Sequence, residues 1–136
     1  MDKGMNRYLL DTNILIYYFA DVIPLEELDT VERILKISFN ISIITRIEFL
    51  GWDKHTKEGY EKAKELISFA KAIPLNNKIA DLTVDIRRNH KIKLPDAVIA
   101  ATALSGNLIL VTRNSKDFSG VEDLEIYNPF KMNAKR

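Results

Sequence analysis

Short apolar runs alternate along the chain with longer segments in which apolar residues recur at helical spacing. Each short run has the length of a buried strand. The run that contains Pro74 suits a sheet edge, because proline lacks a backbone donor. Strands are therefore predicted at 7–10, 41–44, 72–75, 108–112 and 124–127.

The segments between these runs predict helices, because their apolar residues fall three or four positions apart. The last helix is expected to stop at Gly106, since glycine is common just beyond a helix C-terminus. Helices are predicted from near Asp11, over 25–39, from Thr45 to about Trp52, over 58–71 and 78–89, and from Asp96 to about Ser105.

Strands that alternate with helices favour a parallel sheet, because parallel neighbours cannot be joined by tight turns. Right-handed crossovers then place helices on both faces of the sheet. The 136-residue chain, without repeats or linkers, is predicted to be a single α/β domain with a mainly parallel central sheet. Residues 1–5 and 131–136 are expected to be flexible ends, and Met5 is an alternative natural start to Met1.

Composition narrows the possible chemistry. The absence of cysteine excludes thiol catalysis and zinc–thiolate sites, and it suits a reducing cytoplasm. The 20 basic residues nearly match the 19 acidic ones, so any site for a polyanion must be local. Asp11, Thr12 and Asn13 interrupt the apolar stretch near the N-terminus, which therefore predicts neither a signal peptide nor a membrane span. A cytoplasmic protein is expected.

Three acidic residues follow predicted strands. Asp11 comes directly after the first strand, Glu48 lies in the first turn of the helix after the second, and Asp117 lies in the loop after the strand 108–112. In α/β sheets, ligands bind outside the carboxyl ends of the strands, so these side chains are expected at one binding edge. Asp96 begins a helix that is apolar almost all round and must be buried, where an unpaired charge costs several kcal/mol.

If these four carboxylates converge, each pair about 4 Å apart repels by about 4 kcal/mol at an effective dielectric of about 20. A divalent cation would turn this repulsion into attraction. Oxygen ligands without thiolates or a spaced histidine pair favour Mg²⁺ or Mn²⁺. Such ions activate water for attack on a phosphodiester. We therefore predict a metal-dependent nuclease whose catalytic and metal-binding residues are Asp11, Glu48, Asp96 and Asp117.

Each acid also has a structural explanation. Asp11 and Asp96 are suited to cap helices. Thr45 and Glu48 fit a capping box, and Asp117 fits an ordinary turn. Separate caps have no reason to gather at one sheet edge, so the joint pattern favours a functional site.

The acids lie within four motifs, at 8–15, 42–51, 94–103 and 110–118. At these motifs the chain resembles the PIN-domain nucleases, specifically the VapC-type toxins of prokaryotic toxin–antitoxin modules, over essentially its whole length. The resemblance implies a Mg²⁺- or Mn²⁺-dependent endoribonuclease that cuts RNA with metal-activated water. It also implies a homodimer and a cognate antitoxin that holds the enzyme inactive.

The resemblance further implies which residues form the site. Asp11, Glu48 and Asp96 match the metal ligands of the family. Many relatives place a further acid nearer the end of the strand in the fourth motif, where this chain has Asn114, so Asp117 is the available fourth carboxylate. The side chains expected to orient these carboxylates by hydrogen bonding are Asn13, Thr112 and Asn114.

Basic residues flank the acidic motifs. Arg46, Arg113 and Lys116 are candidates for holding RNA phosphates, although surface solvation explains them nearly as well. A second basic cluster follows the helix predicted at 78–89, where it either binds RNA or complements the helix dipole. Its members are Arg87, Arg88, His90, Lys91 and Lys93.

Two other functions compete with the nuclease. A haloacid-dehalogenase-like phosphohydrolase would use Asp11 as a nucleophile, but such enzymes usually carry an aspartate two positions later, where this chain has Asn13. A non-catalytic PIN-fold protein would bind RNA or a protein without cutting, which the intact set of acids disfavours. The sequence leaves open the RNA that is cut, the identity of the antitoxin, and whether one or two ions bind.

Overall fold

The structure, a computed structural model, describes residues 7–130. The predicted flexible ends, 1–5 and 131–136, lie outside the described residues. Five strands form one sheet in the order β3-β2-β1-β4-β5, and every neighbouring pair is parallel. The predicted α/β fold with a parallel central sheet is confirmed. The strands are β1 (Tyr8–Leu10), β2 (Asn40–Ser42), β3 (Lys71–Ile73), β4 (Ile109–Val111) and β5 (Ile126–Tyr127).

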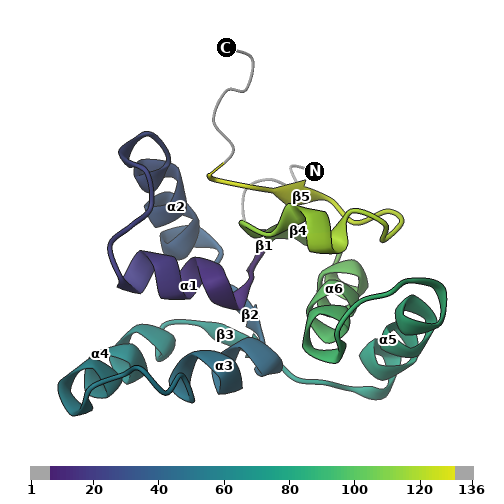
Figure 1. Cartoon of the computed structure of the whole chain (residues 1–136), viewed down its shortest axis with the longest axis horizontal. Helices are drawn as coiled ribbons and strands as arrows, with labels where there is room; N and C mark the ends of the chain where they lie inside the picture. Colours follow the sequence, from purple (N-terminus) through teal and green to yellow (C-terminus); the bar gives the residue numbers. More distant parts are fainter. Residues whose placement is uncertain (1–6, 131–136) are drawn as a thin grey trace.

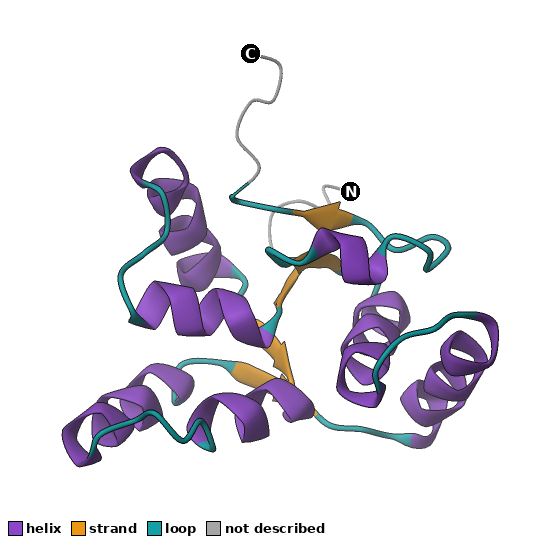
Figure 2. Ribbon diagram, viewed as in Figure 1, coloured by secondary structure: helices purple, strands orange, loops and turns teal. Residues whose placement is uncertain are grey.

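Helices cover both faces of the sheet, as Figures 1 and 2 show. Two helices link β1 to β2, two link β2 to β3, and two link β3 to β4, because parallel strands need crossover connections. A short 3₁₀ helix, η1 (Ser115–Phe118), follows β4. The α-helices are α1 (Thr12–Phe19), α2 (Leu25–Ile37), α3 (Ile43–Leu50), α4 (Lys57–Ile67), α5 (Asn77–Asn89) and α6 (Leu94–Gly106).

Successive side chains of a strand point to opposite faces of the sheet, so the hydrophobic core has two parts, one on each face. Leu9 and Leu110 belong to the cluster that α5 and α6 cover, whereas Leu10 and Val111 belong to the cluster that α1 to α4 cover. All four side chains are fully buried. The strands β1 and β4, which pair Leu10 with Val111, are therefore buried on both faces, and their carboxyl ends lie next to each other.

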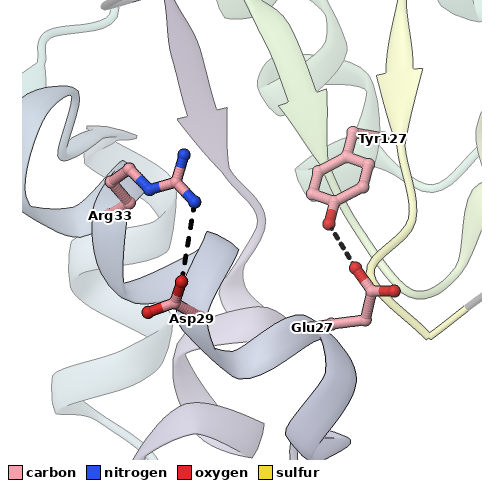
Figure 3. Close-up of polar contacts among 4 residues, drawn as sticks. All are labelled: Glu27, Asp29, Arg33 and Tyr127. Carbon is pink, nitrogen blue, oxygen red and sulfur yellow. Dashed lines mark hydrogen bonds and ion pairs between the residues drawn. The ribbon is translucent and has the colours of Figure 1, made fainter.

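The hydrogen bond between Tyr127 and Glu27 ties the edge strand β5 to α2. The Tyr127 hydroxyl donates to Glu27 Oε1 at 2.7 Å, whereas the nearby ion pair between Arg33 and Asp29 is exposed and stays within α2 (Figure 3). Burial and the hydrogen bond to Glu27 raise the pKa of Tyr127, so the phenol keeps its proton. This contact holds α2 against the end of the sheet.

Several predicted helix boundaries are wrong. The helix α2 ends at Ile37 rather than at residue 39, and α4 ends at Ile67 rather than at residue 71. The helix α3 begins at Ile43 and is capped by Ser42, whose hydroxyl accepts from the Ile44 amide at 3.0 Å. Glu48 therefore lies in the second helical turn rather than the first, and it does not form a capping box with Thr45.

The last long helix, α6, differs from its prediction at both ends. It begins at Leu94 rather than at Asp96, with Pro95 in its first turn, where a missing amide costs nothing. At the other end Gly106 is still helical, and Asn107 adopts the left-handed conformation (φ 54°) that ends the helix. Asparagine tolerates this conformation better than most residues with a side chain.

The helix α6 is buried on nearly every side, as its apolar composition predicted. Its alanines have no exposed area, and Asp96 in its first turn is partly buried. Small side chains let α6 approach both α5 and the sheet closely, which fixes where Asp96 lies. The fully buried alanines are Ala97, Ala100, Ala101 and Ala103.

Within residues 7–130, no helix combines the length and the apolar character needed to cross a lipid bilayer.

We expect Ala100→Leu to destabilise the fold by about 1–3 kcal/mol, because added methylene groups overpack a filled core. The free energy of unfolding, measured by urea denaturation, checks this value. Val84→Leu is the matched control, since Val84 on α5 is 55% exposed and its enlargement should stay within about 0.5 kcal/mol of the wild type. Equal effects of the two changes would contradict the packing described for α6.

Candidate active site

Asp11 is the most buried acid of the candidate site, with 3% of its surface exposed. It follows β1 and caps α1: its Oδ1 accepts from the Thr12 amide at 2.8 Å. Its Oδ2 accepts from the Thr112 hydroxyl at 2.7 Å, and its own amide donates to the carbonyl of Val111 at 2.9 Å. Asp11 is therefore held at the junction of β1 and β4 by bonds to both carboxylate oxygens.

Glu48 reaches the same edge from α3. The Thr12 hydroxyl lies 2.7 Å from Glu48 Oε1 and 3.0 Å from the hydroxyl of Thr45. A hydroxyl has one proton, and the carboxylate can only accept, so Thr12 donates to Glu48 and accepts from Thr45. The hydrogen-bonded hydroxyl groups of Thr45 and Thr12 thus connect α3 to the start of α1.

The sequence interpretation missed Thr12 and Thr45 as residues of the site. In the sequence, Thr12 interrupts an apolar stretch, and Thr45 is suited to cap a helix. The available signal was that Thr12 follows a strand-end aspartate directly, and that Thr45 precedes Glu48 by three positions and so shares its helix face.

Electrostatic repulsion links all four predicted acids. Burial raises the pKa of Asp11 to about 6; the hydrogen bond from Thr112 opposes the shift, and the charges of Asp96 and Glu48 add to it. Burial also raises the pKa of Asp96, together with the charges of Asp117 and Glu48. The four carboxylates thus lie in one neighbourhood. The charges of Glu48 and Asp96 disfavour the ionisation of Asp11, and the charges of Glu48 and Asp117 disfavour that of Asp96.

A cavity of about 280 Å³ opens beside two of these acids, Asp96 and Asp117. Asp96 and Asp117 line it together with lysine side chains from the α5–α6 loop and from η1. Lys93 lowers the pKa of Asp96, in opposition to the burial and the neighbouring acids. The remaining lining residues are Lys91, Ile92 and Lys116.

The chemistry of these residues fits a divalent cation, although the ligands are not preassembled. Among residues 7–130, no three histidine, aspartate or glutamate side chains lie together as a formed metal-binding group. No basic residue in the described part of the chain is among the groups that shift the pKa of Asp11. The buried Oδ1 of Asn13, two positions after Asp11, also lacks a hydrogen-bond partner. Glu48 and Asp117 are exposed, and the hydrogen bond from Thr12 involves only one carboxylate oxygen of Glu48.

The other polar residues predicted around the acids occupy different places. Thr112 bonds Asp11 directly and in turn accepts from the backbone amide of Asn114 at 3.0 Å. The backbone of Asn114 thus orients the hydroxyl of Thr112. The buried Oδ1 of Asn13 makes no hydrogen bond in the structure.

The structure separates the three basic residues predicted to hold RNA. Lys116 lines the cavity of Asp96 and Asp117. Arg46 lines a different cavity, of about 540 Å³, between α3 and α4. The guanidinium of Arg113 lies 5.1 Å from the ring centre of Tyr17 and 4.5 Å from that of Phe130, so it packs between two aromatic side chains.

The all-parallel sheet and the carboxylates at its carboxyl edge define an α/β protein with an acidic candidate active site. The PIN domain family model matches residues 8–124, and the chain belongs to this family. None of the curated proteins compared with the chain matches it significantly.

Solved structures of toxin–antitoxin complexes resemble the chain over nearly its full length. A toxin–antitoxin complex from Klebsiella pneumoniae is 33% identical, with a TM-score of 0.73 over 92% of this chain and 99% of that chain. VapBC2 from Rickettsia felis, bound to a DNA fragment from its promoter, is 27% identical, with a TM-score of 0.75 over 89% and 97%. VapBC-1 from nontypeable Haemophilus influenzae is 26% identical, with a TM-score of 0.77 over 91% and 98%. The predicted resemblance to VapC-type toxins is confirmed.

We expect Asp11→Asn to stabilise the metal-free protein at neutral pH. Folding raises the pKa of Asp11 from 3.8 to about 6, so the folded state holds this proton more tightly than the unfolded chain. The contribution of Asp11 to the free energy of unfolding is therefore most favourable below its unfolded pKa. It falls as the pH rises toward about 6 and stays low above that pH. The full difference is at most about 3 kcal/mol.

Urea denaturation in chelator at a series of pH values between about 4 and 8 checks this expectation. The advantage of Asp11→Asn over the wild type should grow across this range, because asparagine cannot ionise. Its Oδ1 can accept from the Thr12 amide, and its Nδ2 can donate to the Thr112 hydroxyl, which reverses the direction of that bond. Asp81→Asn, an exposed change on α5, is the control and should show no such growth. A constant difference between Asp11→Asn and the wild type would contradict the burial of a charged Asp11.

Proposed function

We propose that this protein is a Mg²⁺- or Mn²⁺-dependent endoribonuclease, the toxin of a toxin–antitoxin pair. The observation that carries the proposal is the buried carboxylate of Asp11, whose pKa no basic residue in the described part of the chain shifts and which faces the negative field of Asp96 and Glu48. Such an arrangement stores repulsion unless a cation joins it. Membership of the PIN domain family supports nuclease chemistry at this edge.

In this proposal Asp11, Glu48 and Asp96 hold the ion and Asp117 completes the set. When bound, the ion neutralises the carboxylates, lowers the pKa of a water molecule, and stabilises charge on the phosphate. Thr112 and the Thr12 amide fix the plane of the Asp11 carboxylate by bonding one oxygen each. The carboxylate therefore has little rotational freedom to lose when a ligand arrives.

Thr12 has a second task in the proposed mechanism. Its hydroxyl donates to Glu48 Oε1, which turns this exposed side chain toward Asp11 and leaves Oε2 free for a ligand. Thr45 supports Thr12 from the buried side of α3. The burial of Asp11 also keeps bulk water away from one side of the acids, which strengthens every charge interaction there.

The antitoxin is proposed as the protein partner, because the structural relatives at 26–33% identity are toxin–antitoxin complexes or VapBC pairs. A hollow of about 540 Å³ beside α1, α2 and α4 is lined by apolar and aromatic side chains together with Glu32 and Lys36, and its lining residue Phe69 is 73% exposed. Such a hollow suits the apolar face of a partner helix. A homodimer in the cytoplasm is the assembly and the location that we expect.

We expect the purified protein to cleave total cellular RNA in Mg²⁺ or Mn²⁺ and to lose this activity in chelator. Asp11→Asn and Asp96→Asn should each lower the cleavage rate by on the order of a hundredfold or more, since changes in residues that merely orient metal ligands already cost about 10–100-fold. Sequencing of the cut ends would identify the substrate. Gel electrophoresis of a labelled RNA gives the rate.

Asp81→Asn is the matched control, because it removes the same charge from an exposed site on α5. It should cleave RNA at the wild-type rate. Cleavage that persists in Asp11→Asn would point to a contaminating nuclease. RNA binding without cleavage in either metal would favour a non-catalytic PIN-fold protein, and phosphate release from small monoesters would favour a phosphohydrolase.

A further inference from the structure

Unpaired lysines wall the cavity beside the acids. Lys91, Lys93 and Lys116 all line it and are all exposed. Within residues 7–130, the ion pairs closer than 4.0 Å join Arg33 to Asp29 and Lys64 to Glu61, so these three lysines have no carboxylate partner at that distance. Apart from the interaction of Lys93 with Asp96, the charge of these lysines is therefore available to a ligand.

A second hollow, of about 460 Å³, lies next to this cavity. Lys91 and Ile92 line both hollows, so the two meet at the α5–α6 loop. The second hollow extends to Arg87 and Arg88 at the end of α5, and both arginines are exposed. A run of basic side chains thus leads away from Asp96 along one side of the molecule. We call this run, Arg87, Arg88, Lys91, Lys93 and Lys116, the basic groove.

Packing holds the loop that forms the floor of the basic groove. The His90 amide donates to the Ile86 carbonyl at 2.9 Å and ends α5. The imidazole of His90 lies against Gly120, where an added Cβ would sit 3.2 Å from its Nδ1. Ile92 packs against the core. The α5–α6 loop therefore rests on the segment after η1, and its lysines project from a supported backbone.

We propose that the basic groove binds the phosphates of the RNA strand next to the phosphate that is cut. This inference rests on the proposed function. Four carboxylates repel a polyanion, and the chain as a whole carries a net charge of only +1, so attraction for RNA must come from a local set of cations. The basic groove supplies five such cations and begins at Asp96 itself.

The charge pattern explains why the groove and the acids are neighbours. A strand whose neighbouring phosphates bind Lys91, Lys93 and Lys116 brings its next phosphate to Asp96 and Asp117, which line the same cavity. The cations thereby supply the affinity, and the acids are left to hold the ion at the cut phosphate. Phosphate contacts of this kind position a strand without reading its sequence.

The test uses Asp11→Asn as the parent protein, so that RNA stays intact during binding. The probe is a short fluorescent oligouridylate, titrated by anisotropy at several salt concentrations. Adding Lys91→Ala, Lys93→Ala and Lys116→Ala should lower the slope of log affinity against log salt by about 2, since each phosphate contact on a single strand contributes about 0.7. At about 0.1 M salt the affinity should fall on the order of a hundredfold.

A matched triple change on another surface controls for net charge. Lys54, Lys57 and Lys62 are exposed residues of α4 and the segment before it, and their replacement by alanine removes the same charge. Figure 1 places α4 and α5 at opposite ends of the molecule. The control should bind the probe as the parent does, and thermal melts should show that both triple variants are folded.

Three results would overturn the proposal: equal losses in the two triple variants, no loss in the groove variant, or displacement of the probe by polyglutamate as effective as by unlabelled RNA. The last result would assign the groove to an acidic protein segment. The wild-type cleavage assay keeps this test separate from the proposed function. Binding that depends on the lysines, without cleavage in either metal, would reject the nuclease function and retain the proposed role of the basic groove. Cleavage with an unchanged KM in the groove variant would reject only the proposed role of the basic groove.

Discussion

The burial of the Asp11 carboxylate at the meeting point of β1 and β4 is the constraint on which the rest of the site depends. Both of its oxygens accept hydrogen bonds, yet burial and neighbouring acids still raise its pKa to about 6. Hydrogen bonds alone therefore do not offset the loss of hydration. The fold keeps a group that is unfavourable for stability, and such groups concentrate where a protein binds or reacts.

The parallel sheet makes this arrangement possible. Because β1 and β4 are adjacent and parallel, residues that follow them in the chain meet although they are 101 positions apart. The alanines of α6 then let that helix approach the sheet closely enough to bring Asp96 to the same edge. Each acid reaches the site from a different element, so the site forms only when the whole domain is folded. Its stability and its chemistry are thus linked through packing rather than through any one loop.

Much of this organisation could be predicted from local patterns. The alternation of strands and helices predicted the α/β fold, and the rule that ligands bind at the carboxyl ends of strands predicted one common edge for Asp11, Glu48 and Asp117. Asp96 was predicted separately, from its place at the start of a buried helix. Contacts that depend on side-chain direction could not be predicted in this way. The start of α3 at Ile43 places Glu48 in the second helical turn, and the guanidinium of Arg113 packs between the rings of Tyr17 and Phe130. Both outcomes are decided by tertiary neighbours, which periodicity does not encode.

The nearness of acids and lysines has a consequence for how the proposed ligands would bind. A metal ion lowers the repulsion that the carboxylates exert on an incoming phosphate, and a phosphate adds ligand oxygens for the ion. Linkage requires that each then raises the affinity for the other by the same factor. Lys93 acts against this coupling, since it already offsets part of the charge of Asp96 before either ligand arrives. The position of Lys93 therefore balances two demands: attraction for RNA, and enough unneutralised charge on Asp96 to hold an ion.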